Sequence, residues 1–186
     1  CITYNMAQQN IKQIIKQEYI KCAKDPVYFM KKYCWIQHPT RGRVQFNLYP
    51  FQEGTLNLLQ KNDRNIILKS RQLGISTLSA GISLWMMVFQ KDKAILVVAT
   101  KQDTAKNLVT KVKFMYDNLP SWLQIGFTEN NKLALRLKNG SQVKAVSAAS
   151  DAGRSEAISL LIIDEAAFIE ENRIEEIWGS SQQTLS

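Results

Sequence analysis

Three short runs of aliphatic and β-branched residues most constrain how this chain can fold. They span residues 65–69, 94–99 and 160–163, and the first two lead through short loops into helical segments at about 76–90 and 104–118. Such runs are typical of strands buried on both faces of a parallel sheet, with helices as the connections between them. The alternation predicts an α/β fold in which a mainly parallel sheet is flanked by helices.

A turn signal lies between the second and third runs. Residues 133–137 and 142–146 each alternate apolar and polar side chains, and Asn139-Gly140 separates them. Asn-Gly favours a two-residue hairpin turn, because both residues tolerate a left-handed backbone. We therefore expect a hairpin before the strand at 160–163 and an acidic helix after that strand.

The start of the chain has a different pattern. Helical spacing over residues 7–23 stops near Pro26, a second short helix follows, and residues 44–48 alternate as in a short strand. Next comes a proline suited to the first turn of a helix that runs to about residue 60. These patterns predict a small helical lead-in over residues 1–48 and an α/β core over residues 49–186.

Composition limits the class of protein. With 45% hydrophobic residues the chain can bury a core, which excludes a disordered or fibrous chain. A formal net charge of +8 and a pI of about 9.4 favour a polyanionic partner such as nucleic acid. The longest apolar run, residues 84–89, is far shorter than the roughly 18 to 20 residues that cross a bilayer, so no membrane span is expected. Three cysteines without zinc-type spacing, and no signal peptide, predict reduced thiols in a cytosolic, non-secreted protein.

The eight residues Ser-Arg-Gln-Leu-Gly-Ile-Ser-Thr that follow Lys69 lie between a predicted strand and a predicted helix. A loop in that place binds phosphate when a glycine allows close approach and a hydroxyl is available for Mg²⁺. Gly74, Ser76 and Thr77 meet these requirements. Two other requirements fail, because Lys69 stands where the phosphate-loop pattern has its first glycine and Ile75 where it has a lysine.

Two cations in this region can replace the missing lysine. Arg71 lies inside the loop and Lys69 at the end of the predicted strand. The planar guanidinium of an arginine is better suited to contact two phosphate oxygens. Strand, loop and helix with Gly and Ser also occur as a purely structural unit, which is the alternative.

Asp164 and Glu165 directly follow the apolar run at 160–163. Ligands of parallel sheets bind at the carboxyl ends of strands, where the glycine-containing loop also opens. One carboxylate there can hold Mg²⁺, usually through water, and the other can orient and deprotonate an attacking water. An acidic helix cap after a strand is the alternative. Together with the loop, the pair favours nucleotide hydrolysis.

Several segments together resemble one known family. They are residues 49–52 (Tyr-Pro-Phe-Gln), 68–77 and 161–168, with residues 25–29 and 36–39 resembling the family's helical lead-in. The pattern is similar to the ATPase domain of the terminase large subunit of tailed bacteriophages, the motor that packages DNA. This resemblance implies a P-loop NTPase-like fold that hydrolyses ATP to move double-stranded DNA into a procapsid.

The resemblance also implies roles for single residues. Gln52 matches a glutamine that recognises adenine, the alternative being an ordinary exposed helix residue. Ser76 and Asp164 match the ligands of Mg²⁺, and Glu165 matches the catalytic base. The residues then expected to bind ATP are Gln52, Lys69, Ser70, Arg71, Gln72, Leu73, Gly74, Ile75, Ser76 and Thr77.

Two arginines are catalytic by the same resemblance. Arg71 matches an arginine of the family's phosphate loop. Arg154 lies where the family places an arginine finger that completes a neighbouring subunit's site, and a surface arginine in a glycine-containing loop is the alternative.

The implied cofactors are ATP and Mg²⁺. The implied partners are double-stranded DNA, other terminase large subunits in a ring, the portal protein and the small terminase subunit. The implied location is the host cytoplasm, with transient docking on the procapsid. The family continues beyond the acidic pair with a coupling strand and a nuclease domain, so we expect a chain that is incomplete at its C-terminus and weakly active alone.

Two other functions stay open at this stage. Without the loop lysine the chain can be a degenerate, non-hydrolysing nucleotide fold that serves as a structural or DNA-binding module. A DEAD-like helicase domain shares an upstream glutamine and an acidic strand end, but it normally keeps the loop lysine. His38, the single histidine, is expected to be structural.

Overall fold

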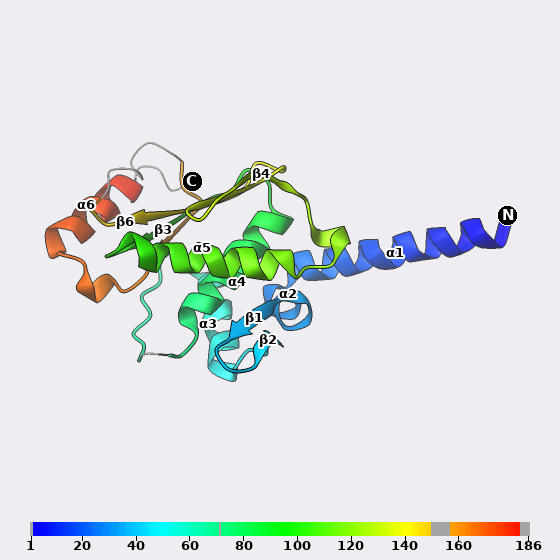
Figure 1. Ribbon diagram of the computed structural model, residues 1–186, viewed down its shortest axis with the longest axis horizontal. Coiled ribbons are helices and arrows are strands. Elements are labelled where there is room, and N and C mark those ends of the chain that lie inside the picture. Colours follow the sequence, from blue (N-terminus) through cyan, green and yellow to red (C-terminus); the bar gives the residue numbers. More distant parts are fainter. Residues whose placement is uncertain (1, 71, 150–156, 183–186) are drawn as a thin grey trace.

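The computed structural model describes residues 2–70, 72–149 and 157–182 of the chain (Figure 1). Its helices and strands are α1 (Ile2–Lys24), α2 (Pro26–Tyr33), β1 (Trp35–His38), β2 (Gly42–Gln45), α3 (Pro50–Lys61), α4 (Ile75–Phe89), β3 (Ala94–Ala99), α5 (Gln102–Asp117), a 3₁₀ turn (Ser121–Leu123), β4 (Phe127–Asn130), β5 (Ala134–Leu137), β6 (Gln142–Ser147), β7 (Leu160–Ile163), a second 3₁₀ turn (Ala166–Phe168) and α6 (Glu171–Gln182). The helices lie within a few residues of the expected positions, and the predicted α/β fold is confirmed.

In the described part of the chain, the main sheet has the strand order β4-β5-β6-β3-β7. β3 pairs in parallel with β6 on one side and with β7 on the other. β5 pairs antiparallel with β4 and with β6, and the β5–β6 turn at Asn139-Gly140 confirms the predicted hairpin. A separate antiparallel hairpin consists of β1 and β2. The parallel strands bring their carboxyl ends to one edge, which is where ligands bind in such folds.

Alternate residues of β3 and β7 face two different layers. Val97 and Ile162 contact the main core, which also contains the buried faces of α4 and α5. Val98 and Ile163 contact a smaller core that includes Ile174 of α6. Figure 1 shows α5 running across one face of the sheet and α6 near the opposite end of the molecule from the N-terminus. The sheet is therefore covered by helices on both faces.

Helix α4 is the central helix of the main core. It is apolar around most of its circumference, which is typical of a helix surrounded by other elements. It contacts α2, α3 and α5, and Leu78, Leu84 and Met87 are almost completely buried. Its first turn is held in place by this packing, and that turn carries Ser76.

The lead-in packs onto the same core. Phe29 and Met30 of α2 are fully buried beside α4. α1 projects from the body (Figure 1), and its C-terminal end is held where Trp85 Nε1 donates a hydrogen bond to the carbonyl of Cys22 at 2.9 Å. A division of the chain after residue 48 stays a prediction.

Glu18 joins α1 to α2. One of its carboxylate oxygens accepts hydrogen bonds from Lys32 Nζ at 2.8 Å, from the Tyr28 hydroxyl at 2.6 Å and from the Tyr33 hydroxyl at 2.8 Å. The hydrogen bond from Lys32, then that from Tyr28, lowers the pKa of Glu18 to about 2. The ionised carboxylate is thus part of the link between the two helices.

The prediction of a strand over residues 65–69 is wrong. This segment pairs with no strand of the described chain, and Ile66 and Leu68 are fully exposed. A strand needs a backbone partner, and this segment pairs neither with β7, the last strand of the sheet order, nor with any other described strand. Two short strands, β1 and β4, were not expected, and β2 begins earlier than the predicted strand at 44–48.

Three further expectations concern the cysteines, His38 and membrane-spanning helices. Cys22 and Cys34 are buried free thiols, as expected, and burial raises the pKa of Cys22 to about 11. His38 Nδ1 accepts hydrogen bonds from the backbone N–H groups of Thr40 and Arg41 within a turn, which fits a structural role. None of the helices in the described part of the chain has the length and apolar character needed to cross a membrane.

Candidate functional site

The turn before α4 has a backbone that only certain residues adopt easily. Gln72 has a φ of 63° and Gly74 a φ of 71°, both in the left-handed region. Gly74 is the N-cap of α4, and its carbonyl accepts the hydrogen bond of Leu78 at 2.9 Å. A Cβ on Gly74 would lie 2.7 Å from Gln52 Nε2. A glycine is therefore required here by both the backbone angle and the space.

Gln52 holds this turn against α3. Its side chain is 2% exposed, so it is not the ordinary exposed residue of the alternative interpretation. Nε2 donates a hydrogen bond to the Leu73 carbonyl at 3.0 Å, and Oε1 accepts one from the Tyr49 N–H at 3.0 Å. The structure thus assigns this amide a structural contact with the loop, and its recognition of adenine stays a prediction.

Ser76 and Asp164 are brought together from distant parts of the chain. Ser76 Oγ donates a hydrogen bond to Asp164 Oδ2 at 2.7 Å, although 88 positions separate them. Asp164 is held at the end of β7, because its N–H donates to the Val98 carbonyl at 2.9 Å and its Oδ1 accepts the Glu165 N–H at 3.0 Å. The hydroxyl of the helix α4 terminus and the carboxylate of the sheet edge therefore form one site.

Glu165 follows Asp164 in an uncommon conformation. Its φ is 56°, in the left-handed region, and its side chain is exposed. For a residue with a Cβ this conformation costs about 1–2 kcal/mol, and such residues cluster at functional sites. Glu165 thus departs from the strand direction immediately after Asp164 and lies at the solvent side of the site.

Ile75 has the role of a core residue. It is 8% exposed and belongs to the main core. Lys69, Ser70 and Gln72 are exposed, and Thr77 is half-buried. The position where the phosphate-loop pattern has its lysine is therefore occupied by a side chain that packs inward.

Lys111 is a residue near the site that the sequence patterns did not single out. It lies on α5 and is half-buried. Burial lowers its pKa, with the carboxylate of Asp164 raising it and Lys69 lowering it further. The signal that could have found it is a lysine at helical spacing from Leu108 and Met115, both of which are buried.

Arg71 and Arg154 lie outside the described residues. Their expected catalytic roles therefore stay predictions.

The chemistry of the Ser76–Asp164 pair fits Mg²⁺. A hydroxyl and a carboxylate oxygen are hard ligands of the kind Mg²⁺ prefers, and Mg²⁺ usually keeps several waters and takes few protein ligands. The described residues contain no group of three or more His, Cys, Asp or Glu side chains that could hold a metal ion. A sparse oxygen site of this kind suits a cation shared with phosphates rather than a metal enclosed by protein.

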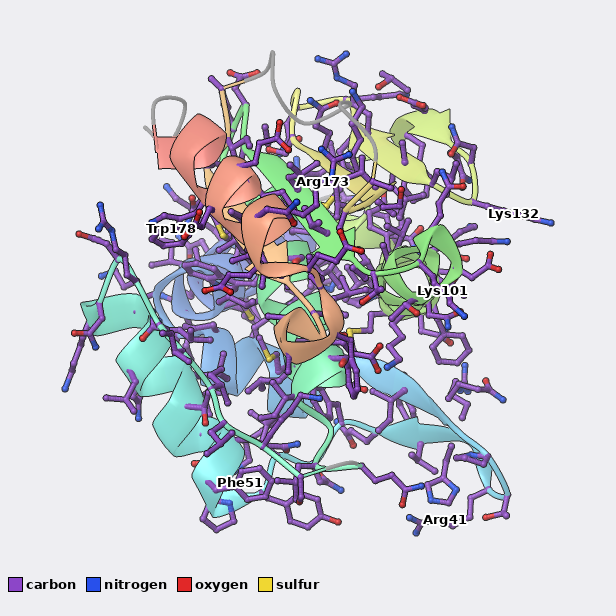
Figure 2. All side chains as sticks on the ribbon, turned by 90° about the vertical axis from the view of Figure 1, so that its left-hand side faces the viewer. Arg41, Phe51, Lys101, Lys132, Arg173 and Trp178 are labelled. Atoms are coloured by element: carbon purple, nitrogen blue, oxygen red, sulfur yellow. The ribbon has the colours of Figure 1, made fainter. Side chains whose placement is uncertain are left out.

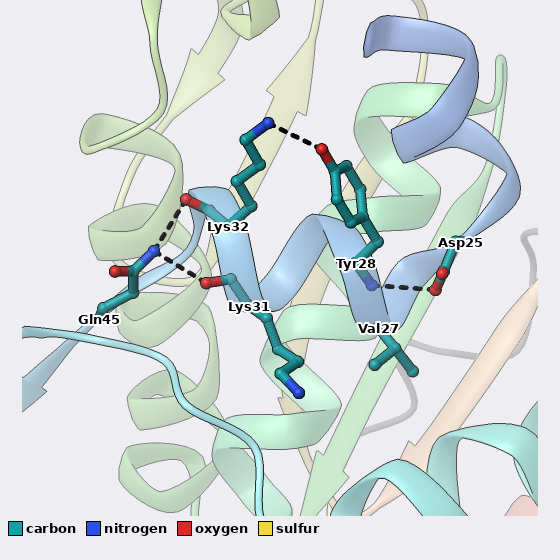
Figure 3. A pocket seen from close by; sticks show the side chains of 6 residues that line it. All are labelled: Asp25, Val27, Tyr28, Lys31, Lys32 and Gln45. Carbon is teal, nitrogen blue, oxygen red and sulfur yellow. Dashed lines mark hydrogen bonds between the residues drawn. The ribbon is translucent and has the colours of Figure 1, made fainter.

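A pocket of about 450 Å³ lies elsewhere, on the lead-in (Figure 3). Gln45 Nε2 donates to the carbonyls of Lys31 and Lys32 at 2.8 and 3.0 Å. The Asp25 carboxylate accepts the Tyr28 N–H at 2.9 Å and so caps α2. These hydrogen bonds join the β1–β2 hairpin to α2 and cap that helix, so the polar residues that line the pocket have a structural role.

The fold has a solved counterpart. The crystal structure of the HK97 bacteriophage large terminase matches this chain with a TM-score of 0.69 and 21% sequence identity. The match covers 87% of this chain and 35% of the HK97 chain. The fold of this chain is thus that of part of the HK97 large terminase.

The family follows from a second comparison. Residues 66–184 match the model of the N-terminal part of the terminase large subunit of the T4-like-virus type. The chain belongs to this family, as the sequence resemblance indicated.

Proposed function

We propose that this chain binds ATP with Mg²⁺ and hydrolyses it to drive double-stranded DNA into a viral procapsid. The observation that carries the proposal is the 2.7 Å hydrogen bond between Ser76 Oγ and Asp164 Oδ2 at the N-terminus of α4. Membership of the terminase large subunit family supports it.

Phosphate binding would use the start of α4. The first N–H groups of a helix have no intrahelical partner, and the helix dipole makes that end positive. Gly74 leaves the approach to these groups open, because it has no side chain to cover them. Residues 69–77 would surround the phosphates, and Gln52 would hold the loop while it reads the adenine edge.

Ser76 and Asp164 would hold the cation. When bound, Mg²⁺ would neutralise negative charge on the phosphates during transfer. The hydroxyl and carboxylate already lie within hydrogen-bond distance, so both oxygens can turn toward a shared ligand with small movements.

Glu165 would act as the general base. Its carboxylate would accept a proton from a water while the water oxygen attacks the γ-phosphorus and the bond to the ADP oxygen breaks. The turn after Asp164 puts Glu165 on the exposed side, where a water can reach it. Arg154 of a neighbouring subunit would stabilise charge on the γ-phosphate, and Arg71 or Lys69 would supply the cation that the loop lacks.

DNA binding would rest on phosphate contacts. The net charge of +8 favours a polyanion, and Figure 2 shows Arg41, Lys101 and Lys132 along one side of the molecule, away from Trp178 of α6. Contacts of this type carry no base sequence information and weaken steeply with salt. Other large subunits, the portal protein and the small subunit are further partners that the family suggests, and the host cytoplasm is the matching location.

One observation favours a second function. Ile75 is buried where a phosphate-binding lysine is expected. A nucleotide fold that no longer hydrolyses ATP would retain the architecture and act as a structural module of the packaging complex.

Turnover of ATP distinguishes these functions. Wild-type chain is compared with Glu165→Gln and with Glu175→Gln, an exposed glutamate of α6 that serves as the matched control. The proposed ATPase requires Mg²⁺-dependent phosphate release that Glu165→Gln reduces at least about 100-fold, a typical general-base effect, while binding persists. Equal rates in all three proteins, or ATP binding with no release by the wild type, would reject hydrolysis at Glu165.

A further inference from the structure

Lys111 lies at the border between the buried and exposed sides of α5. Leu108 is three residues before it and Met115 four residues after it, and both are buried in the main core. Residues at these spacings share one face of a helix. The stem of Lys111 therefore follows apolar surface, while its ammonium group extends beyond it, as long cationic side chains commonly do.

The other side of α5 shows which way Lys111 faces. Lys113 Nζ lies 5.5 Å from the centroid of the Phe127 ring on β4 and 2.7 Å from Asp117. Two residues along a helix correspond to a rotation of roughly 200°, so Lys111 faces away from Lys113. β4 and β7 are the opposite ends of the strand order. Lys111 is thus on the side of α5 that faces β7, where Asp164 ends the strand.

The charges around Lys111 agree with this direction. Burial lowers the pKa of Lys111, and of the charged side chains in the described residues Asp164 raises that pKa while Lys69 lowers it. Asp164 belongs to the end of β7, and Lys69 precedes the turn that enters α4. No ion pair holds Lys111 within the described ranges of the chain, whereas Lys106 and Lys113 on the other side pair with Asp103 and Asp117.

We propose that Lys111 supplies the phosphate-binding cation that the loop lacks, with its ammonium group contacting the terminal phosphates of ATP. This inference rests on the ATP binding proposed above. Ile75 can then stay in the core, because the positive charge comes from α5 rather than from the first residue of α4. An ammonium group at a half-buried position attracts phosphate more strongly than one in bulk water, because the surrounding dielectric is lower.

The test compares three substitutions in the whole chain, with MgATP and AMP as the ligands in a calorimetric titration. Lys111→Met removes the charge but keeps most of the stem, and Lys111→Arg keeps the charge. Lys113→Met is the matched control from the other side of α5. We expect Lys111→Met to weaken MgATP binding about 10-fold or more, the usual effect of losing a hydrogen bond to a charged group. AMP binding should change little, and the other two variants should bind MgATP within a few-fold of wild type.

The outcomes separate this inference from the function on which it rests. If the wild-type chain and Lys111→Met bind MgATP with the same affinity, the role of Lys111 is overturned and the proposed ATP binding stands. Lys69→Met is measured as a fourth substitution, and a loss seen with it but not with Lys111→Met overturns the inference in favour of Lys69. Wild-type chain that does not bind MgATP overturns both. A thermal unfolding curve of Lys111→Met close to that of wild type shows that a binding loss reflects the missing charge.

Discussion

The side-chain amide of Gln52 donates a hydrogen bond to the backbone carbonyl of Leu73, 21 positions later in the chain. The same amide accepts a hydrogen bond from the Tyr49 N–H, so one buried side chain fixes both the start of α3 and the turn before α4. The amide still has a second N–H and a second lone pair on Oε1. Because Gln52 is 2% exposed, reading an adenine edge with these groups requires the adjacent turn to move and uncover the amide.

Gln52→Leu should destabilise the chain by about 1–3 kcal/mol, because it leaves two partly buried backbone groups, the Tyr49 N–H and the Leu73 carbonyl, without their partner. Gln60→Leu, at an exposed position of the same helix, is the control and should change stability little. Urea unfolding measures both. If Gln52 also reads adenine, Gln52→Glu, which keeps the acceptor for the Tyr49 N–H and removes the amide donor, should reduce the preference for ATP over GTP. An unchanged preference would leave Gln52 with the structural contact alone.

Gly74→Ala should destabilise the chain and weaken ATP binding. The φ of 71° costs an alanine about 1–2 kcal/mol, and the new Cβ would lie 2.7 Å from Gln52 Nε2. Gly54→Ala is a control for which the opposite sign of stability change is expected. A Cβ on this helical glycine would have open space around it, so the substitution should stabilise α3 by up to about 1 kcal/mol. Urea midpoints at unchanged slope measure both effects. The same sign for both substitutions would contradict the described geometry.

Ser76→Ala should remove most of the effect of Mg²⁺ on ATP binding. The substitution deletes the hydroxyl that contacts Asp164 and leaves the loop backbone in place. Ser79→Ala, one turn further along α4, should behave as wild type. Titrations with and without Mg²⁺ give the ratio of the two ATP affinities, which measures the effect of the cation. A ratio that Ser76→Ala leaves unchanged would exclude this hydroxyl as a ligand.

Stability should fall in acid through Glu18. Its pKa in the folded chain is about 2, below the ordinary value of 4.5, so the unfolded chain binds the proton more readily. The contribution of Glu18 is therefore complete above about pH 4.5 and is lost as the pH falls toward 2. Glu18→Gln should lower stability at neutral pH and flatten the decline below pH 4.5, as measured by unfolding at several pH values. Glu175→Gln, on the exposed surface of α6, should keep the wild-type decline.

Local patterns predicted the helices and the hairpin well. Helical spacing depends on neighbours three and four residues away, and the turn at Asn139-Gly140 depends on the backbone freedom of those residues. The run at 65–69 has the composition of a buried strand, but Ile66 and Leu68 are exposed because a strand also needs a distant backbone partner. Local composition cannot supply that partner.

The sequence by itself determined the α/β class, the family, and the residue types of the site: a glycine before α4, a serine in its first turn and two carboxylates after β7. Tertiary structure decided that Ser76 and Asp164 touch and that Gln52 holds the loop. The physical reason is that residue spacing encodes local conformation, whereas contacts across 88 positions arise only when helices pack onto a sheet and bury their apolar faces together.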